Sequence, residues 1–340
     1  MNTSTATADN SSSPENEYDN EIISLLRDSA DDFCTRSLDL GRLRALRDEG
    51  ISFDRQHWQT IAELGWLGVA VSEEAGGLGL GAQGAATLSR SFGKVAAPEP
   101  LIETAVASAS LIADAGGQNE LLETLIEGNN VCVTALGRID SDIYAATTAS
   151  EEAAGTYIDC SLSAVPLGPH ADTWLVPAML AGDPTWLAVA RDADGVELET
   201  RILSDGSIDA RLVFRHCPAT LIARGDKARG AGMLARTMAE LASSAYQLGL
   251  AETLFTTTTD YVSTRTQFGQ AIGSFQSLQH RLVDCFIDLR LAEAVVDECI
   301  REYDRGTSDE QALLLASRAR QRSGQALQLI SREAIQMHGA

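Results

Sequence analysis

The sequence predicts an α+β protein of three consecutive domains: helical, then β, then helical. In roughly the first 130 residues and again after Gly230, apolar residues recur at three- and four-residue steps, the period of an amphipathic helix. Between these stretches, short β-rich runs alternate with Gly, Pro and Asp turns, which is typical of antiparallel strands. With 340 residues and 44% hydrophobic content, the chain can bury two or three such cores.

The N-terminal part is expected to be a leader followed by a helical domain. Residues 1–16 are rich in Ser, Thr and Asn and offer little apolar surface to bury, so we expect a disordered leader there. The N-terminal helical domain is expected over residues 17–130. Its helices are predicted at Ile22–Phe33, Phe53–Leu67, Ala82–Phe92, Ala105–Ala115 and Glu120–Ile126.

The middle part, residues 131–230, is predicted to form a small antiparallel β-barrel or sandwich. Turn sequences such as Gly182-Asp-Pro184 separate its strands. The expected strands are Val131–Thr134, Thr156–Ile158, Trp174–Pro177, Trp186–Ala190, Gly195–Glu199 and Arg211–Phe214.

The last part, residues 231–340, returns to long helices. The final helix is expected to open at Ser308-Asp-Glu-Gln311, a capping-box pattern. At an earlier junction, Gly269 is expected to end one helix in the left-handed conformation and Ser274 to cap the next. The side chains that crowd around this turn would suit an anionic, aromatic ligand. They are Arg265, Gln267, Phe268 and Gln276.

Composition excludes several classes of protein. The formal net charge of -22 argues against nucleic-acid binding, and no apolar run is long enough to span a membrane. The N-terminus has no apolar core segment of the kind that marks a secretory signal. Six scattered cysteines without Cys-x-x-Cys pairs argue against a metal centre or a disulfide framework and favour reduced thiols in the cytoplasm.

A glycine-rich stretch, Gly79-Leu-Gly-Ala-Gln-Gly84, formally satisfies the dinucleotide fingerprint. The fingerprint requires a strand that runs directly into the first glycine. Here seven residues separate Val71 from Gly79, so we expect a tight loop between helices instead of a nicotinamide site.

Three blocks of sequence together resemble the acyl-CoA dehydrogenase family. The Arg265-Thr-Gln-Phe-Gly269 turn, followed by Phe275-Gln and Gln279-His280, resembles the family's C-terminal motif. Trp58 to Gly81 resembles its N-terminal block, and Gln336-Met-His-Gly-Ala340 resembles the start of its final flavin-binding loop. The resemblance implies the family's three-part fold, in which the C-terminal domain is a four-helix bundle.

The resemblance also implies an FAD site. By this match, Arg265 would contact the FAD pyrophosphate of a neighbouring subunit, a contact that suits a permanently charged fork. Gln267 and Phe268 would touch the phosphate and adenine side, and Gln276 the adenosine half. Gln336 and Gly339 would touch the ribose and pyrophosphate. Phe275 is more simply explained as a core residue, and no role is assigned to His280 or His338.

The implied reaction is α,β-dehydrogenation of an acyl-CoA thioester, with electron-transfer flavoprotein as the implied acceptor. A Glu would remove the α-proton while the β-hydrogen leaves as hydride. In most of the family this Glu follows the loop in which the chain ends at Ala340, so the C-terminal domain is expected to be truncated. In another branch of the family, the Glu lies on the helix before the Arg265 turn. Ungapped counting back from Arg265 places that position at Ala239. Glu240 is adjacent but rotated by about 100°, which makes it a weak candidate for the base.

The β domain departs from the family pattern. Where the family carries Thr-Glu-Pro near Thr134, this chain reads Val-Thr-Ala-Leu-Gly-Arg. Where an aromatic and a hydroxyl cover the flavin ring, it reads Val165-Pro-Leu-Gly-Pro, and Leu167 offers no hydroxyl.

Such departures resemble the shorter, divergent subunits of heteromeric acyl-CoA dehydrogenases that act on steroid-derived or other bulky CoA esters. We therefore expect a homologous partner subunit, in a homo- or heterotetramer, and most simply a dimer of heterodimers in which the partner supplies the base. Two alternatives stay open: a homomeric enzyme whose base follows Ala340, and a catalytically silent flavin-binding or scaffolding homologue.

Overall fold

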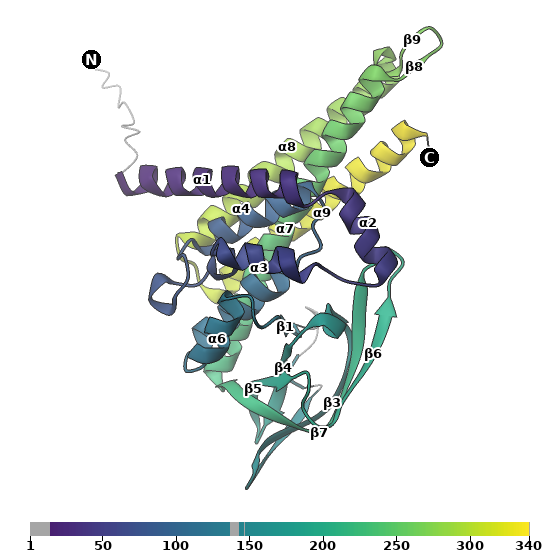
Figure 1. Ribbon diagram of the computed structural model, residues 1–340. Coiled ribbons are helices and arrows are strands. Elements are labelled where there is room, and N and C mark those ends of the chain that lie inside the picture. The colour runs from purple at the N-terminus through teal and green to yellow at the C-terminus, as the bar shows by residue number, and fades with distance from the viewer. Residues whose placement is uncertain (1–13, 137–142, 146, 340) are drawn as a thin grey trace, which may run out of the picture.

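The computed structural model describes residues 14–136, 143–145 and 147–339 (Figure 1). Helix α1 begins at Pro14, so it already includes the last residues of the expected leader, while residues 1–13 lie outside the described residues. The helical elements of the N-terminal domain are α1 (Pro14–Ser37), α2 (Leu40–Glu49), α3 (Arg55–Glu63), η1 (Trp66–Gly68), η2 (Glu73–Ala75), α4 (Gly81–Lys94), η3 (Leu101–Ser108), α5 (Ala109–Ala115) and α6 (Asn119–Ile126).

Helix α2 was not predicted, because its sequence is strongly polar. Local capping supports it: Asp39 accepts a hydrogen bond from the Arg42 backbone N–H, and Gly50 ends the helix with φ 71°. The segment η3 is a π-helix that continues into α5, in a region predicted as one regular helix. The hydroxyls of Thr104 and Ser108, both on η3, donate to the Cys132 carbonyl at 2.9 and 3.0 Å. These bonds tie η3 to the first strand of the β domain.

The β domain is a barrel whose strand pairings close on themselves. Its strands are β1 (Cys132–Thr134), β2 (Thr148–Glu152), β3 (Gly155–Pro166), β4 (Thr173–Leu180), β5 (Asp183–Ala190), β6 (Val196–Ile202) and β7 (Ile208–Arg224), with a short turn η4 (Gly168–His170). Strand β4 pairs with β2, β2 with β3, β3 with β7, β7 with β5, and β5 again with β4. Most pairings are antiparallel, as predicted, but β4 runs parallel to both β1 and β2.

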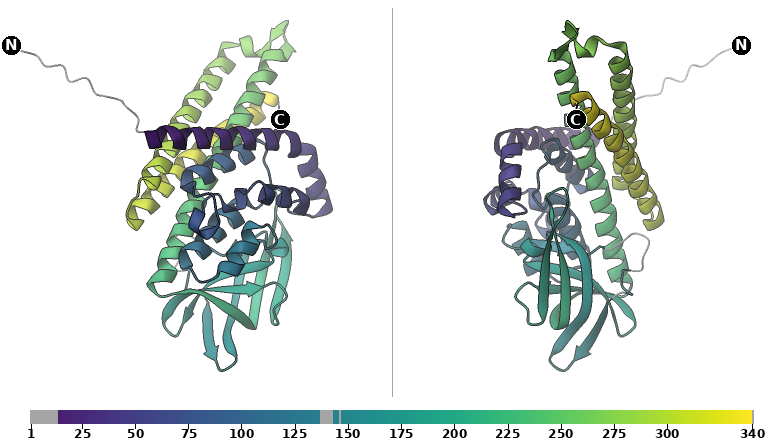
Figure 2. Two further views of the ribbon diagram at one scale, coloured as in Figure 1. Left: turned by 60° about the vertical axis from the view of Figure 1, so that its left-hand side comes forward. Right: turned by 90° about the vertical axis from the view of Figure 1, so that its right-hand side faces the viewer.

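The C-terminal domain consists of long helices joined by a small hairpin. Its elements are α7 (Asp226–Thr264), β8 (Thr266–Gln267), β9 (Gln270–Ala271), η5 (Ile272–Ser274), α8 (Gln276–Asp304) and α9 (Asp309–His338). Within the described residues there are three long helices where the resemblance implied a bundle of four. The Ser308 cap is confirmed, because its side chain accepts from the Gln311 N–H. Helix α7 runs from the β domain to the far tip of the molecule, where β8 and β9 lie (Figures 1 and 2).

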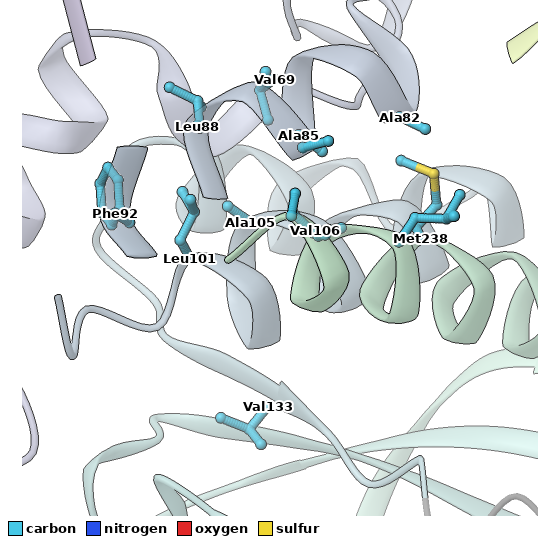
Figure 3. Close-up of a cluster of buried hydrophobic side chains, with 14 of the residues drawn as sticks. Val69, Ala82, Ala85, Leu88, Phe92, Leu101, Ala105, Val106, Val133 and Met238 are labelled. Atoms are coloured by element: carbon cyan, nitrogen blue, oxygen red, sulfur yellow. The ribbon is translucent and has the colours of Figure 1, made fainter. Parts of the chain in front are cut away.

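One apolar cluster holds the three domains together (Figure 3). Phe92 of α4, Leu101 of η3 and Met238 of α7 are all buried in it, and Val133 of β1 approaches from the sheet side. These side chains come from all three domains. Their close packing therefore holds the domains in one arrangement relative to each other.

Candidate functional site

The hairpin between α7 and α8 presents the residues that the sequence singled out. Arg265, Gln267 and Phe268 are all exposed, and the Phe268 side chain reaches 93% exposure. Phe268 also adopts a left-handed φ of 53°, which a bulky residue rarely does. Within the described part of the chain, the Arg265 guanidinium meets no ion-pair partner. An unpartnered arginine beside an exposed aromatic ring is suited to an anionic, planar ligand.

The second predicted segment lies at the same end of the helical domain. Tyr261, one turn before Arg265, stacks on His338, with ring centroids 4.1 Å apart. Gln336 and Gly339, which flank His338, are therefore held beside the end of α7. Both are exposed, and Gly339 ends α9 with φ 87°. Gln276 begins α8 and is also exposed, so all six predicted cofactor residues lie toward this tip.

Two local expectations at the junction are wrong. Helix α7 ends at Thr264, and Gly269, with φ 81°, forms the turn of the β8–β9 hairpin instead of a helix cap. Ser274 does not cap α8, because its hydroxyl donates to the Ala271 carbonyl at 2.7 Å inside η5. The two-residue strands β8 and β9 pair and make the junction a projecting hairpin. Strands this short are not predicted from β-propensity alone.

A cavity of about 890 Å³ lies between the three domains. It is walled by α2, the start of η3, the β domain, the middle of α7 and one face of α9. Among its lining residues are Leu43, Leu101, Glu103, Leu167, Tyr246 and Leu327. Pockets for small molecules span roughly 300–1,000 Å³, so this one is large enough for a bulky ligand. Along α7, Tyr246 and Arg265 are about 28 Å apart at 1.5 Å per residue, which separates the cavity from the hairpin of the same chain.

Three glutamates lie in or near the cavity in different environments. Glu99 is buried and forms an ion pair with Arg42; burial nonetheless raises its pKa above the ordinary value. Glu103, on η3, is partly accessible, and burial raises its pKa as well. Glu240 lies outside the cavity lining and forms an ion pair with Arg320 at 3.3 Å. The sequence reading did not single out Glu99 or Glu103. Glu103 could have been found from the sequence, because it is an acid inside the apolar run Leu101-Ile-Glu-Thr-Ala-Val-Ala107.

One departure in the β domain, Leu167, falls on this cavity. Leu167 lines it and has a left-handed φ of 55°, while Val165 is buried in the barrel. An apolar side chain thus stands where the family pattern has a hydroxyl. The Ala-Leu-Gly-Arg sequence after Thr134 leaves the described residues at position 137.

Helix α8 carries a half-exposed apolar face, on which Phe286 contacts Phe255 of α7 and the Arg290 guanidinium. Val283, Phe286, Ile287 and Leu291 follow one helical face and are between 44% and 54% exposed. Spacings of three, one and four residues place these side chains on one stripe. A contiguous exposed stripe of this kind marks an interaction surface.

Other classes of site find no support in the described residues. The Gly79–Gly84 loop leads into α4, whose first N–H groups, those of Ala82 and Gln83, donate to Asp304 at 2.9 and 2.8 Å. That helix terminus is therefore occupied by a carboxylate of the chain itself. Over the described ranges there is no cluster of three potential metal ligands, and no helix is long and apolar enough to cross a membrane. All six cysteines are free.

Comparison with known proteins places this geometry in a family. Two models match: the acyl-CoA dehydrogenase N-terminal domain over residues 20–127 and the acyl-CoA dehydrogenase C-terminal domain over residues 232–340. The chain is 26% identical over 318 residues to the acyl-CoA dehydrogenase IpdE2 of Mycobacterium tuberculosis, covering 93% of this chain and 84% of that protein.

Two further similarities agree. The chain is 29% identical over 255 residues to the acyl-CoA dehydrogenase FadE27 of Mycobacterium tuberculosis, covering 70% of this chain and 64% of FadE27, less than two thirds of its length. Among solved structures, the Tcur3481-Tcur3483 steroid ACAD superposes with a TM-score of 0.84 and 27% identity, over 95% of this chain and 88% of that one. This chain belongs to the acyl-CoA dehydrogenase family.

Proposed function

We propose that this chain is a subunit of an oligomeric, FAD-dependent acyl-CoA dehydrogenase that forms the α,β double bond of an acyl-CoA thioester. The observation that carries the proposal is the projecting hairpin. It exposes Arg265 and Phe268 at the tip of the molecule, far along α7 from the cavity of the same chain. A clamp in that position can reach a ligand held by a neighbouring subunit.

The residues at the tip fit FAD. Its pyrophosphate needs a cation that is not already paired, which Arg265 supplies, and its adenine needs an exposed planar surface, which Phe268 supplies. Gln267, Gln276 and Gln336 offer amide donors and acceptors for the ribose and adenine. Gly339 leaves room for close approach of the backbone. When bound, FAD supplies a hydride acceptor for the β-hydrogen of the thioester.

An oligomer follows from the α8 stripe. Burying Val283, Phe286, Ile287 and Leu291 against a second subunit would remove apolar surface from water, at roughly 25 cal/mol per Å². We propose that the partner is a homologous acyl-CoA dehydrogenase chain, in a homo- or heterotetramer. The name of the Tcur3481-Tcur3483 steroid ACAD pairs two chains, which supports a heteromer and a bulky, steroid-derived acyl group.

The α-proton requires a base, and Glu99 and Glu103, which line the cavity, do not lie at a position where the family carries its catalytic Glu. Glu240 is held by Arg320 and does not line the cavity, so it remains a weak candidate. We propose that a Glu of the partner subunit serves as the base. Electron-transfer flavoprotein is the acceptor that we expect. Free thiols support a cytoplasmic location for the complex.

The test is anaerobic addition of acyl-CoA to the purified, flavin-loaded complex. Loss of the visible flavin absorption, with appearance of an enoyl-CoA two hydrogens lighter by mass spectrometry, would support dehydrogenation. A complex that binds FAD but is not reduced by any acyl-CoA would favour the silent, scaffolding homologue, and a chain that never binds FAD would exclude the proposal.

A further inference from the structure

Glu103 is an acid without a partner in the wall of an apolar cavity. It lies on the π-helix η3, between the buried Leu101 and the buried Thr104. Within the part of the chain that the structure describes, its carboxyl meets no cation, and its one hydrogen-bond donor is its own backbone N–H. π-helical segments are rare and are frequent at functional sites.

The polar side chains near Glu103 in the cavity wall already have partners elsewhere in the protein. The Tyr246 hydroxyl donates to the Ala97 carbonyl at 3.0 Å, and Glu99 is paired with Arg42. Next to Tyr246 on α7, the side-chain oxygen of Gln247 accepts from the Ser323 hydroxyl at 2.8 Å. Glu99, Glu103 and Tyr246 all line the cavity, and burial, followed by the nearby charges of Glu103 and Glu99, raises the pKa of Tyr246. Each of them except Glu103 has a partner within the protein.

An unpartnered carboxyl costs free energy in such a place. Leu, Ile, Phe and Tyr side chains dominate this side of the cavity and give a carboxylate no hydrogen bonds, so only water that enters the cavity can solvate it. A leucine or methionine would fill the same position without that cost. We therefore expect that a polar group of the ligand forms a hydrogen bond with the Glu103 carboxyl when the ligand enters the cavity.

We propose that Glu103 recognises an uncharged oxygen function, a hydroxyl or a ketone, on the acyl group of the thioester. The proposal rests on the proposed function, since it assigns the cavity to the acyl group. A carboxyl accepts from a hydroxyl and, in its protonated form, donates to a ketone, whereas a plain hydrocarbon at the same position leaves it unpaired. The site would thus select oxygenated acyl groups over saturated hydrocarbon ones.

The size of the cavity agrees with this selection. At about 890 Å³ it accommodates a broad acyl group. The hydrocarbon part can contact Leu43 and Leu327 while a single oxygen of the acyl group forms a hydrogen bond with Glu103. A single carboxyl in an apolar pocket discriminates strongly, because the ligand that lacks the oxygen must bury the carboxyl without a bond.

The test compares matched acyl-CoA pairs, straight-chain and cyclic, that differ only by a hydroxyl at the distal carbon. Calorimetry on the purified, flavin-loaded complex gives the dissociation constant of each, with free CoA as reference. We expect the hydroxylated member to bind about ten-fold or more tightly in wild type. The preference should vanish in Glu103→Leu and partly survive in Glu103→Gln, which keeps hydrogen-bonding groups.

Asp205→Asn is the matched control, because it removes an exposed carboxylate that also lines the cavity. It should leave the preference unchanged. Equal binding of both members in wild type and in Glu103→Leu would overturn the inference while leaving the proposed function intact. If neither member binds more tightly than free CoA, the proposed function fails, and this inference fails with it.

Discussion

The Tyr261 ring stacks on the His338 imidazole, with centroids 4.1 Å apart and planes 15° apart. Tyr261 lies in the last turn of α7, which leads into the hairpin, and His338 is the last residue of α9, between Gln336 and Gly339. These segments are far apart in the sequence, and this contact brings both halves of the proposed FAD clamp to one tip. The sequence assigned no role to His338. Its contact with Tyr261 nevertheless holds the neighbouring Gln336 and Gly339, two predicted FAD residues, beside the end of α7.

Breaking this stack should weaken FAD binding. Tyr261→Leu removes an aromatic pair that contributes about 0.5–1.5 kcal/mol, so we expect a roughly two- to ten-fold rise in the FAD dissociation constant by fluorescence titration. Tyr157→Leu is the matched control, because Tyr157 stacks on His216 at 4.2 Å in the β domain, away from the tip. Equal losses in both variants would contradict the placement of the clamp.

Arg265→Ala should remove FAD without affecting the fold. The side chain is exposed and has no ion-pair partner among the described residues, so the melting temperature of the cofactor-free protein should stay the same. Loss of one charge-assisted contact to the pyrophosphate should weaken FAD binding about ten-fold or more. Arg211→Ala removes another exposed arginine, which lies 3.8 Å from Glu199 in the β domain, and should retain its flavin. Full flavin content in Arg265→Ala would exclude this contact.

A charge on the α8 stripe should dissociate the oligomer. Ile287→Asp places a carboxylate in the centre of the proposed interface, where it cannot be solvated once the subunits associate. Native mass spectrometry should show smaller species, with loss of FAD, since the clamp then has no neighbour. Ile202→Asp alters a residue of β6 that is 71% exposed and should preserve the assembly. An intact oligomer in Ile287→Asp would place the interface elsewhere.

Glu103 should make stability fall as pH rises. Burial raises its pKa above 4.5, so the folded chain keeps the proton over a range in which the unfolded chain has lost it. Its favourable contribution is complete below about pH 4.5 and is lost as the pH passes through the raised pKa. Relative to wild type, Glu103→Gln should therefore become progressively more stable in denaturant unfolding above that pH. A difference that does not change with pH would show that Glu103 is solvated like a surface acid.

Much of the fold could be predicted because periodicity and capping are local signals. The Ser308 cap lies where the capping box placed it, and α4 and α6 match their predicted stretches closely. Strand β2 was missed because Thr148–Glu152 carries no alternating apolar pattern, having only Ala149 buried. The parallel pairings of β4 depend on chain crossings that no local pattern encodes.

The site was only partly predictable for a related reason. Four of the six predicted cofactor residues were found because they are close in sequence, from Arg265 to Gln276. The cavity unites residues as distant as Leu43 and Leu327, so its lining could not be read from spacing. Glu103 was passed over because its place beside Tyr246 follows from tertiary packing of η3 against α7.

The most direct test of the central claim is the visible absorption spectrum and native mass of the chain, expressed alone and then with acyl-CoA dehydrogenase chains of its own genome. We predict that the chain expressed alone is colourless or aggregates, and that co-expression with one partner gives a yellow mixed oligomer. A yellow, FAD-loaded homomer that is fully active by itself would contradict the partnered-subunit proposal.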